Sequence, residues 1–519
     1  MQRSRGVALA LFVALVAGAS PASADVLGRA LRVLDDGETG GPAPPPADDL
    51  LSWAGPTRAT SLPALLSNAV ERVPSLASAK LDIEVAEARI QQTMSRDDWR
   101  IRGQAYAQSS SGFISGFRID RSTTIGGFAE LSRVLPTGGT IAFRASTDYS
   151  RVTSPIDGSI QTNWTEEVNV SFIQPLLEGR GRWLYEANER RAALSRDAAV
   201  LAKRLAAINT VQVIVSAYWD LVLAERQVAI TRASLALAQE RLRITQIGAD
   251  GGKVPRSELP AVQQIIATRQ EEILSAELAV LDRSIALRRA AGMPIGAGEL
   301  GLRVETDLAT REVTWDLGAL TQRAFDASPE LAQLAKQDAS TKILIDVTEN
   351  GLMPRLDAAI TLGPRSQADT PTQALRDLAR VDSFAITGSL TVEHSLGQEQ
   401  VRGQAREARA NLRQLEVNAF DIRAQIAQTM ARAVAQLELA RRRIELSQRA
   451  IDLANENIKI ESDRFNLGRS TNFDVLNRQE ELRQAELRKS QAMIDWHKAE
   501  SVVQALTADI LPAYGITTE

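Results

Sequence analysis

The sequence predicts a mainly α-helical fold with a membrane β-barrel, in which one helix–strand–strand–long helix–helix unit occurs twice. Two long runs contain neither glycine nor proline, residues 182–247 and 404–467. At 1.5 Å per residue, each run could form a helix roughly 100 Å long. Strand-like alternation precedes both runs. Near their ends, the similar segments ALAQERLRI (236–244) and DLANENIKI (452–460) approach a glycine at the same spacing.

The N-terminal segment has the pattern of a secretory signal peptide. Arg3 and Arg5 precede the apolar run VALALFVALVAG, and small residues follow at Ala22–Ala24. A positive start, a short apolar core and a small-residue exit are typical of a cleaved signal; the alternative is an uncleaved anchor. We therefore assign residues 1–24 to a signal peptide. Residues 25–60, rich in proline, glycine and acidic residues, are assigned to an extended leader.

The composition argues against several classes of function. The chain of 519 residues has no cysteine, and its net charge of −4 comes from interspersed signs. It therefore has no disulfide and no thiol nucleophile, and nothing indicates a nucleic-acid partner. After the signal peptide we find no run of about 18 uncharged apolar residues that could form a transmembrane helix. If the exported chain crosses a membrane, it must do so as a closed β-barrel.

The first repeat is predicted to occupy residues 61–292. Helical spacing begins at Leu62 and breaks at Pro74, before the strand-like segments. Residues 124–149 contain two strand-like runs around the turn signal Pro136–Gly139, which predicts an added hairpin. This hairpin could extend a barrel or decorate a surface loop.

The second repeat is predicted at residues 317–507, after a linker at 293–316 and before a tail at 508–519. Pro329 takes the place of Pro74. The segments LDAAITL and FAITGSLTV alternate apolar with small polar residues, as expected for a sheet with one apolar and one polar face. Such a sheet could be one face of an ordinary sandwich, or a barrel with lipid outside and water inside.

Candidate residues for catalysis or metal binding are sparse. The two histidines, His394 and His497, stand isolated in the sequence, and a structural role is expected for both. No cysteine and histidine spacing suits a transition metal. The sequence therefore predicts a protein that is not an enzyme and uses no cofactor or metal.

Together these features resemble the TolC-like outer membrane efflux proteins of Gram-negative bacteria. The resemblance covers residues 60–507. It rests on the duplicated plan and on the motifs ASPEL (327–331), MPRL (353–356), QPLLEGRG (174–181) and FNLGRSTNFDVLNRQEEL (465–482). It implies a homotrimer in which each chain adds four strands to one barrel in outer membrane lipid, while the helices form an α-barrel in the periplasm. A shared barrel is physically reasonable, because four or six strands cannot enclose a water-filled lumen alone.

The resemblance also implies a function and partners. The protein would be a channel-tunnel that exports small molecules or polypeptides, as the exit duct of a tripartite efflux or type I secretion system. Its partners would be a periplasmic adaptor and an inner-membrane transporter. Two alternatives are a periplasm-spanning coiled-coil scaffold without a lumen and the adaptor itself, although two hairpins with alternating strands disfavour the adaptor.

The two predicted turns carry the candidate site residues. Thr471 and Asp474 have the spacing of a capping box that begins the returning helix. In the first repeat Ser257 and Glu258 occupy the matching positions. The resemblance implies an acidic gate at the periplasmic tip, in which Asn477 replaces an expected acid. Such a ring would narrow the entrance for anions and could bind cations; alternatively, Asp474 and Glu258 only favour helix N-termini.

The same turns resemble the surface that a periplasmic adaptor contacts. The candidate contact residues are Gly252, Lys253 and Val254 in the first turn and Leu467, Gly468, Arg469 and Ser470 in the second. The longer first tip, GADGG (248–252), makes the two turns unequal.

Overall fold

The computed structural model describes residues 59–516, apart from 115–116, 154–158, 253, 297–299, 305–307 and 312. All of these residues fall in one compact unit, Ala54–Glu519. The predicted signal peptide and nearly all of the predicted leader lie outside the described residues, as does Lys253.

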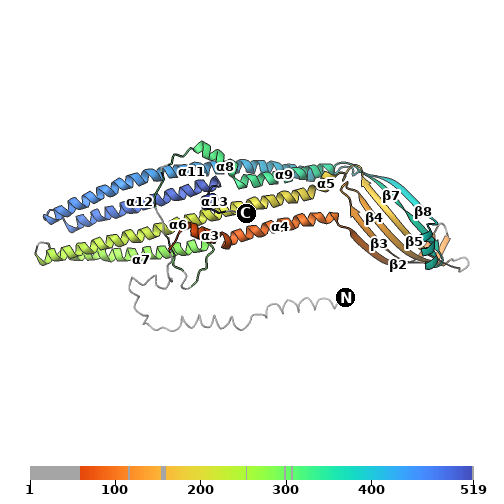
Figure 1. Cartoon of the computed structure of the whole chain (residues 1–519), viewed down its shortest axis with the longest axis horizontal. Coiled ribbons are helices and arrows are strands. Elements are labelled where there is room, and N and C mark those ends of the chain that lie inside the picture. The colour runs from red at the N-terminus through yellow and green to blue at the C-terminus, as the bar shows by residue number, and fades with distance from the viewer. Residues whose placement is uncertain are drawn as a thin grey trace, which may run out of the picture. The chain divides into compact units, whose positions relative to one another are not determined.

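The order of elements repeats, as Figure 1 shows. The first half consists of α3 (Leu62–Arg72), α4 (Pro74–Met94), η3 (Ser95–Asp97), β2 (Arg100–Ile114), β3 (Phe117–Val134), β4 (Thr140–Thr153), β5 (Ile160–Pro175), α5 (Arg182–Tyr185), α6 (Ala187–Asp250), η4 (Arg256–Glu258) and α7 (Leu259–Ala290). The second half consists of α8 (Leu317–Ala327), α9 (Pro329–Asn350), β7 (Arg355–Ala368), α10 (Pro371–Arg380), β8 (Phe384–Glu393), α11 (Glu399–Asn466) and α12 (Asn472–Leu506). Pro74 and Pro329 each begin a helix, where the missing N–H group has no helical partner to lose.

The two long runs without glycine or proline form the helices α6 and α11, as predicted. They contain 64 and 68 residues. Shortly after each helix a glycine adopts a left-handed backbone, with φ of 70° at Gly252 and 68° at Gly468. Glycine takes this conformation without the steric cost of a side chain, which explains why both helices turn back at these points.

The strands form one six-stranded antiparallel sheet in the order β2-β3-β4-β5-β7-β8. The added hairpin is β3 and β4. It is longer than the predicted 124–149, and it lies within the sheet between β2 and β5. The alternative that it decorates a surface loop is therefore wrong. The cross-strand registry is fixed on both sides of the hairpin, and sequence periodicity alone does not supply that information.

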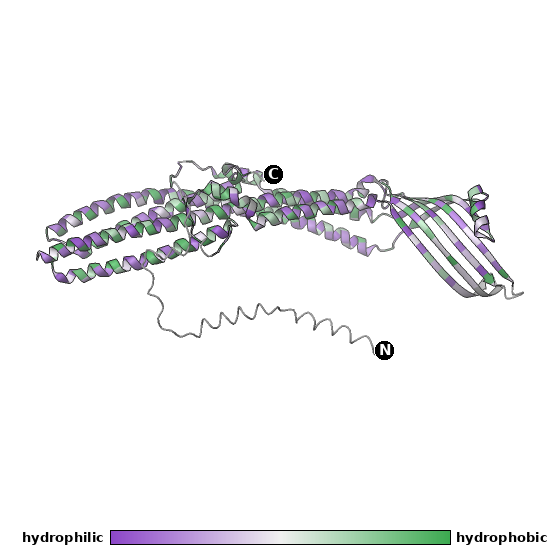
Figure 2. Ribbon diagram, turned by 60° about the horizontal axis from the view of Figure 1, so that its bottom comes forward, coloured by the Kyte–Doolittle hydropathy of each residue, from purple (hydrophilic) through white to green (hydrophobic). Residues whose placement is uncertain are grey.

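Polar and apolar residues alternate along the strands, as the striped strands in Figure 2 show. One transverse row of paired residues is apolar and runs through Leu131, Phe143, Val170, Leu362 and Ile386. A row on the opposite face pairs Glu130 with Arg144 and Arg144 with Asn169. Because successive side chains in a strand point to opposite faces, this alternation gives the sheet one apolar and one polar surface.

Two apolar clusters hold the helices together. The first joins α3, α4, α6 and α7 around residues such as Leu66, Tyr218 and Leu221. The second joins α8, α11 and α12 around Met430 and Leu437. Leu221 and Leu437, which match in the sequence repeat, are both fully buried.

Some segments predicted as connections are folded. β1 (Ala59–Thr60), at the end of the predicted leader, pairs in parallel with β6 (Arg303–Val304) of the linker. In the predicted tail, α13 (Ile510–Ala513) buries Ile510 and Leu511 in the first cluster. Two-residue strands and one-turn helices are too short to produce a recognisable sequence period.

Among the described helices, α6 meets the length and composition criteria for crossing a membrane. Its apolar stretch belongs to the helical core, because Val211, Val215 and Val222 pack in the first cluster. The stretch also includes Asp220, whose carboxylate accepts a hydrogen bond from Lys498 at 2.6 Å. Packing against other helices therefore explains the buried apolar residues of α6, whereas Val213 is 58% exposed.

Candidate functional site at the hairpin tips

The first tip joins α6 to α7. The N–H of Val254 donates to the carbonyl of Gly248 at 3.2 Å and closes the turn. A Cβ atom on Gly248 would lie 2.9 Å from Cγ2 of Val254, so glycine leaves room for this contact. The short helix η4 then leads into α7, with Ser257 exposed and Glu258 half-buried.

The second tip joins α11 to α12 through Leu467, Gly468 and Ser470. The predicted capping box is confirmed. The N–H of Asp474 donates to Oγ1 of Thr471 at 3.3 Å, and Oδ2 of Asp474 accepts from the N–H of Thr471 at 3.1 Å. These bonds satisfy two donors that would otherwise lack partners at the helix start.

Asp474 is held in its ionised form. Hydrogen bonds from the hydroxyl and N–H of Thr471 lower the pKa of Asp474, and the Ser470 hydroxyl and the charge of Arg464 add to this effect. Its carboxylate therefore stays negatively charged at pH values below those at which an aspartate usually becomes protonated. Asp474 is thus an exposed residue that takes part in the capping box and also carries a negative charge.

A buried polar contact connects the two hairpins just behind the tips. Nε of Arg241, on α6, donates to Oδ1 of Asn472 at 2.7 Å, and Oγ1 of Thr245 donates to the same oxygen at 3.2 Å. The amide nitrogen of Asn472 donates to Glu258. The Arg241 guanidinium lies 3.9 Å from the ring centroid of Phe465, on α11. We call these five residues the tip tie.

The electrostatics of the tip tie follow from its burial. Burial lowers the pKa of Arg241, and the charge of Glu258 opposes that effect. Asn472 is the central residue, because it lies between the cation and the anion and bonds to both. Removing it takes the hydrogen-bond acceptor from buried Arg241 and the donor from half-buried Glu258, whereas the Thr245 hydroxyl keeps its bond to the carbonyl of Arg241.

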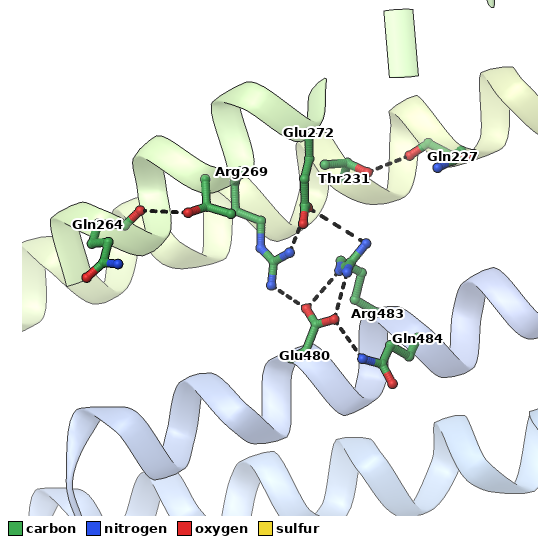
Figure 3. A network of polar contacts seen from close by, with 9 residues as sticks. Gln227, Thr231, Gln264, Arg269, Glu272, Glu480, Arg483 and Gln484 are labelled. Atoms are coloured by element: carbon green, nitrogen blue, oxygen red, sulfur yellow. Dashed lines mark hydrogen bonds and ion pairs between the residues drawn. The ribbon is translucent and has the colours of Figure 1, made fainter. Parts of the chain in front are cut away.

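A second network lies farther from the tip, between α7 and α12 (Figure 3). Arg269 bonds to Glu272 at 2.7 Å and also to Glu480. Arg483 bonds to Glu480 at 2.6 Å and lies 3.8 Å from Glu272. Two arginines and two glutamates thus alternate between the hairpins, and Gln484 donates to Glu480 at 2.9 Å.

The pKa of Glu480 makes this network sensitive to acid. Burial alone raises the pKa of Glu480, but hydrogen bonds from Arg483 and Gln484 and the charges of Arg483 and Arg269 outweigh it and lower the pKa to about 2. A lowered folded-state pKa means that ionised Glu480 stabilises the fold above its unfolded pKa of about 4.5. This stabilisation is lost as the pH falls from about 4.5 toward about 2.

We therefore expect Glu480→Gln to lower the Tm at pH 7 and to have little effect at pH 2.5, where wild-type Glu480 is itself becoming protonated. Thermal unfolding of both proteins across this range is the measurement. Glu481→Gln is the matched control, because Glu481 forms an exposed ion pair with Arg478 and such pairs contribute little. A Tm difference between Glu480→Gln and wild type that does not change with pH would contradict the assignment.

The comparisons with known proteins bear on both the helices and the sheet. Residues 65–293 match the family model described as outer membrane efflux protein. Residues 65–293 belong to this family. The family places the efflux protein in the outer membrane. A search of curated proteins gives no match.

Solved structures share the fold at low sequence identity. The outer-membrane channel OprN is 14% identical, with a TM-score of 0.64 over 91% of this chain and 98% of its own. CmeC, an outer membrane channel of Campylobacter jejuni, is 14% identical, with a TM-score of 0.62 over 91% and 94%. CusC, solved in a study of transmembrane channel formation, is 14% identical, with a TM-score of 0.62 over 87% and 92%.

The structure of the efflux protein separates the predicted gate residues. Asp474 and Ser257 are exposed, whereas Glu258 turns toward Asn472 in the tip tie. Asn477 lines a cavity of about 160 Å³ that Arg269 and other α6, α7 and α12 residues share. Within one chain, Asp474 and Glu258 therefore have different neighbours and different chemical roles.

The predicted adaptor-contact residues lie at the outermost turns. Leu467 is 72% exposed, and Gly252, Gly468 and Arg469 are also exposed. Val254 is half-buried against Gly248, and Ser470 is engaged with Glu461 and Asp474. An exposed leucine beside an arginine therefore forms the most accessible part of the second tip.

The tip tie was not predicted from the sequence. A signal for it exists, since Ala238, Arg241, Thr245 and Ala249 follow helical spacing and all are buried. Two polar residues thus occupy positions on the buried stripe of α6. Polar residues on such a stripe require buried partners, but their identity depends on how the second hairpin packs.

Proposed function

We propose that this efflux protein is the exit duct of a tripartite efflux or type I secretion system and exports small molecules or polypeptides. The main observation in support of this proposal is the order of elements along the chain. A sheet with one apolar face leads into helices of 64 and 68 residues, and these helices end at two polar tips. At 1.5 Å per residue these helices reach roughly 100 Å. That length suits a duct that extends from the outer membrane deep into the periplasm.

Three copies of the chain form the channel. Among the described strands of one chain, β2 and β8 each have a strand partner on one side only. Unpaired backbone groups are not tolerated in hydrocarbon, so β8 of each copy pairs with β2 of the next. The apolar row through Phe143 and Val170 then faces lipid, and the polar row through Arg144 faces the lumen.

At the periplasmic end, Asp474 and Glu258 belong to an entrance gate. Three-fold repetition places the fixed negative charge of Asp474 around the opening, where it disfavours anions and attracts cations. The tip tie holds the two hairpins of each copy together beside this opening. A periplasmic adaptor binds the outermost turns at Leu467 and Arg469 and connects the duct to an inner-membrane transporter.

Replacing Asp474 tests the gate separately from the cap. Asp474→Asn keeps an oxygen that accepts from Thr471 but removes the charge, whereas Asp474→Ala removes both. In planar bilayers we expect both variants to raise the conductance and to weaken block by divalent cations. Only Asp474→Ala should lower the Tm, because it removes the oxygen that accepts from the N–H of Thr471, whereas the bond from the N–H of residue 474 to Thr471 remains.

The results distinguish the roles of this residue and of the protein. If neither variant changes conductance and Asp474→Ala alone lowers the Tm, Asp474 is a helix cap and not a gate residue. If verified trimers of the wild type and both variants conduct no current, the duct proposal fails and a scaffold without a lumen is favoured.

A further inference from the structure

The hairpin β3–β4 enlarges the membrane part of this protein. We propose that it is an integral wall element, so that three copies, each with six strands, close an eighteen-stranded barrel. This inference rests on the proposed trimeric duct. It departs from the barrel that the sequence resemblance implied, in which each chain contributes four strands.

The hydrogen-bonded register is continuous across the hairpin. β3 pairs with β2 from Arg100↔Ser132 and with β4 from Val134↔Thr140. β4 pairs with β5 along its whole length, from Thr140↔Ile173 to Thr153↔Ile160. A hairpin that only decorated the surface would leave β2 and β5 adjacent, whereas here the hairpin separates them.

The turn of the hairpin is also anchored to the helical part of the chain. The N–H of Gly181 donates to the carbonyl of Thr137 at 3.1 Å. Oγ1 of Thr137 donates to Oε1 of Gln174 at 2.8 Å. Gln174 lies near the end of β5 and Gly181 directly precedes α5, so the turn is part of the junction between sheet and helices.

The hairpin has the same two-sided polarity as the rest of the sheet. Leu131 and Phe143 continue the apolar row toward β5, while Glu130 and Arg144 continue the polar one. A plug inside a lumen or a loop in water would not need this alternation. A wall with lipid on one side and water on the other does.

The two free edges of the six-stranded sheet are suited to each other. All neighbouring strands are antiparallel, and the number of strands is even. β8 of one copy therefore meets β2 of the next in antiparallel orientation. At the end of the sheet nearest the helices, β2 begins with Arg100 and Arg102, and β8 ends with Glu393. The pairing places these residues on the polar face, so opposite charges meet at the joint.

The consequence is a wider lumen in the membrane. Barrel diameter grows roughly in proportion to strand number, and barrels of about 16–18 strands enclose an aqueous channel. Eighteen strands in place of twelve make the membrane part about half as wide again. Any limit on cargo size then lies in the α-helical part and at the tip, and not in the barrel.

Spin labelling of single cysteines tests whether the hairpin is part of the wall. The chain has no native cysteine, so Ala129→Cys, Glu130→Cys and Leu131→Cys on β3 each introduce one site. In trimers in lipid nanodiscs, we expect labels at 129 and 131 to be accessible to oxygen dissolved in lipid. The label at 130 should be accessible to a water-soluble nickel reagent. If all three labels are accessible to the nickel reagent alone, the hairpin lies outside the wall and the proposal is overturned.

Cross-linking at the joint provides the second measurement. Arg102→Cys is combined separately with Ser389→Cys and Thr391→Cys on β8, and all three positions are on the polar face. We expect oxidation to give covalent trimers with at least one of these pairs. Arg102→Cys with Leu390→Cys, on the opposite face, is the control that should give none.

The two measurements separate the inference from the proposed function. Labels that alternate on β3 together with covalent trimers support the eighteen-stranded barrel. Covalent trimers with labels that do not alternate overturn only this inference. Protein that forms no trimer in the membrane overturns the proposed duct as well.

Discussion

Asn472→Leu is expected to release the two hairpin tips from each other. Leucine is close to asparagine in size, so the substitution removes hydrogen bonds with little loss of packing. Arg241, Thr245 and Glu258 lose their bonds to the amide group. The Thr245 hydroxyl keeps its bond to the carbonyl of Arg241 and Glu258 is half-buried, so the main cost comes from buried Arg241, at about 1–3 kcal/mol for a buried polar group that loses its partner. Local stability at the tips should therefore fall by about 1–3 kcal/mol, so the tips should open more often while the apolar clusters remain folded.

Hydrogen exchange measured by mass spectrometry is the direct test of this release. Exchange should accelerate in residues 241–258 and 465–476 and remain unchanged around Tyr218 and Met430 in the apolar clusters. In bilayers the variant should also conduct more than wild type. Asn457→Leu on α11 is the matched control, since Asn457 is exposed and outside both the tip tie and the predicted gate. Equal exchange in the two variants would show that the tip tie does not hold the hairpins.

Gly138→Val is expected to prevent correct assembly of the membrane part. Gly138 has φ of 88°, and a Cβ atom there would lie 2.2 Å from the carbonyl oxygen of Gly179. The left-handed backbone alone costs a branched residue about 1–2 kcal/mol. The contact with a backbone atom forces the turn away from the connection between β5 and α5. We therefore expect a large loss of trimer from the outer membrane fraction.

Fractionated membranes and gel mobility of unheated samples measure this loss. Gly296→Val, outside the sheet, is the control, because a Cβ atom at Gly296 meets nothing within 4 Å in the chain and its backbone is not left-handed. It should assemble in amounts close to wild type. Wild-type amounts of trimer in Gly138→Val would mean that the turn is not anchored as the structure indicates.

The sequence was informative where a signal is local or periodic. The long helices follow from the absence of breakers over residues 182–247 and 404–467, and the capping box follows from the spacing of Thr471 and Asp474. The alternation within each strand is equally local. The family resemblance added the expectation that the strands of both repeats lie in a membrane, which sequence periodicity alone cannot provide.

The remaining features depend on contacts between distant parts of the chain. The position of β3–β4 within the sheet is fixed by pairing with β2 and β5. Residues of a hairpin alternate in polarity every two positions both in a barrel wall and in a surface loop, so the alternation alone does not locate the hairpin. The tip tie brings Arg241 and Asn472 together from different repeats. Each residue looks like an ordinary polar residue of a helix until both hairpins are in place.

The composition of the first apolar cluster has a consequence for how the chain folds. Ile494, Ile510 and Leu511 complete a cluster whose other residues come mainly from the first half of the chain. A polypeptide that emerges into the periplasm from its N-terminus therefore exposes Leu66, Tyr218 and their neighbours until residue 511 has followed. The first apolar cluster is therefore incomplete until the end of the chain has joined it, so the packing of the first half depends on residues 494–511.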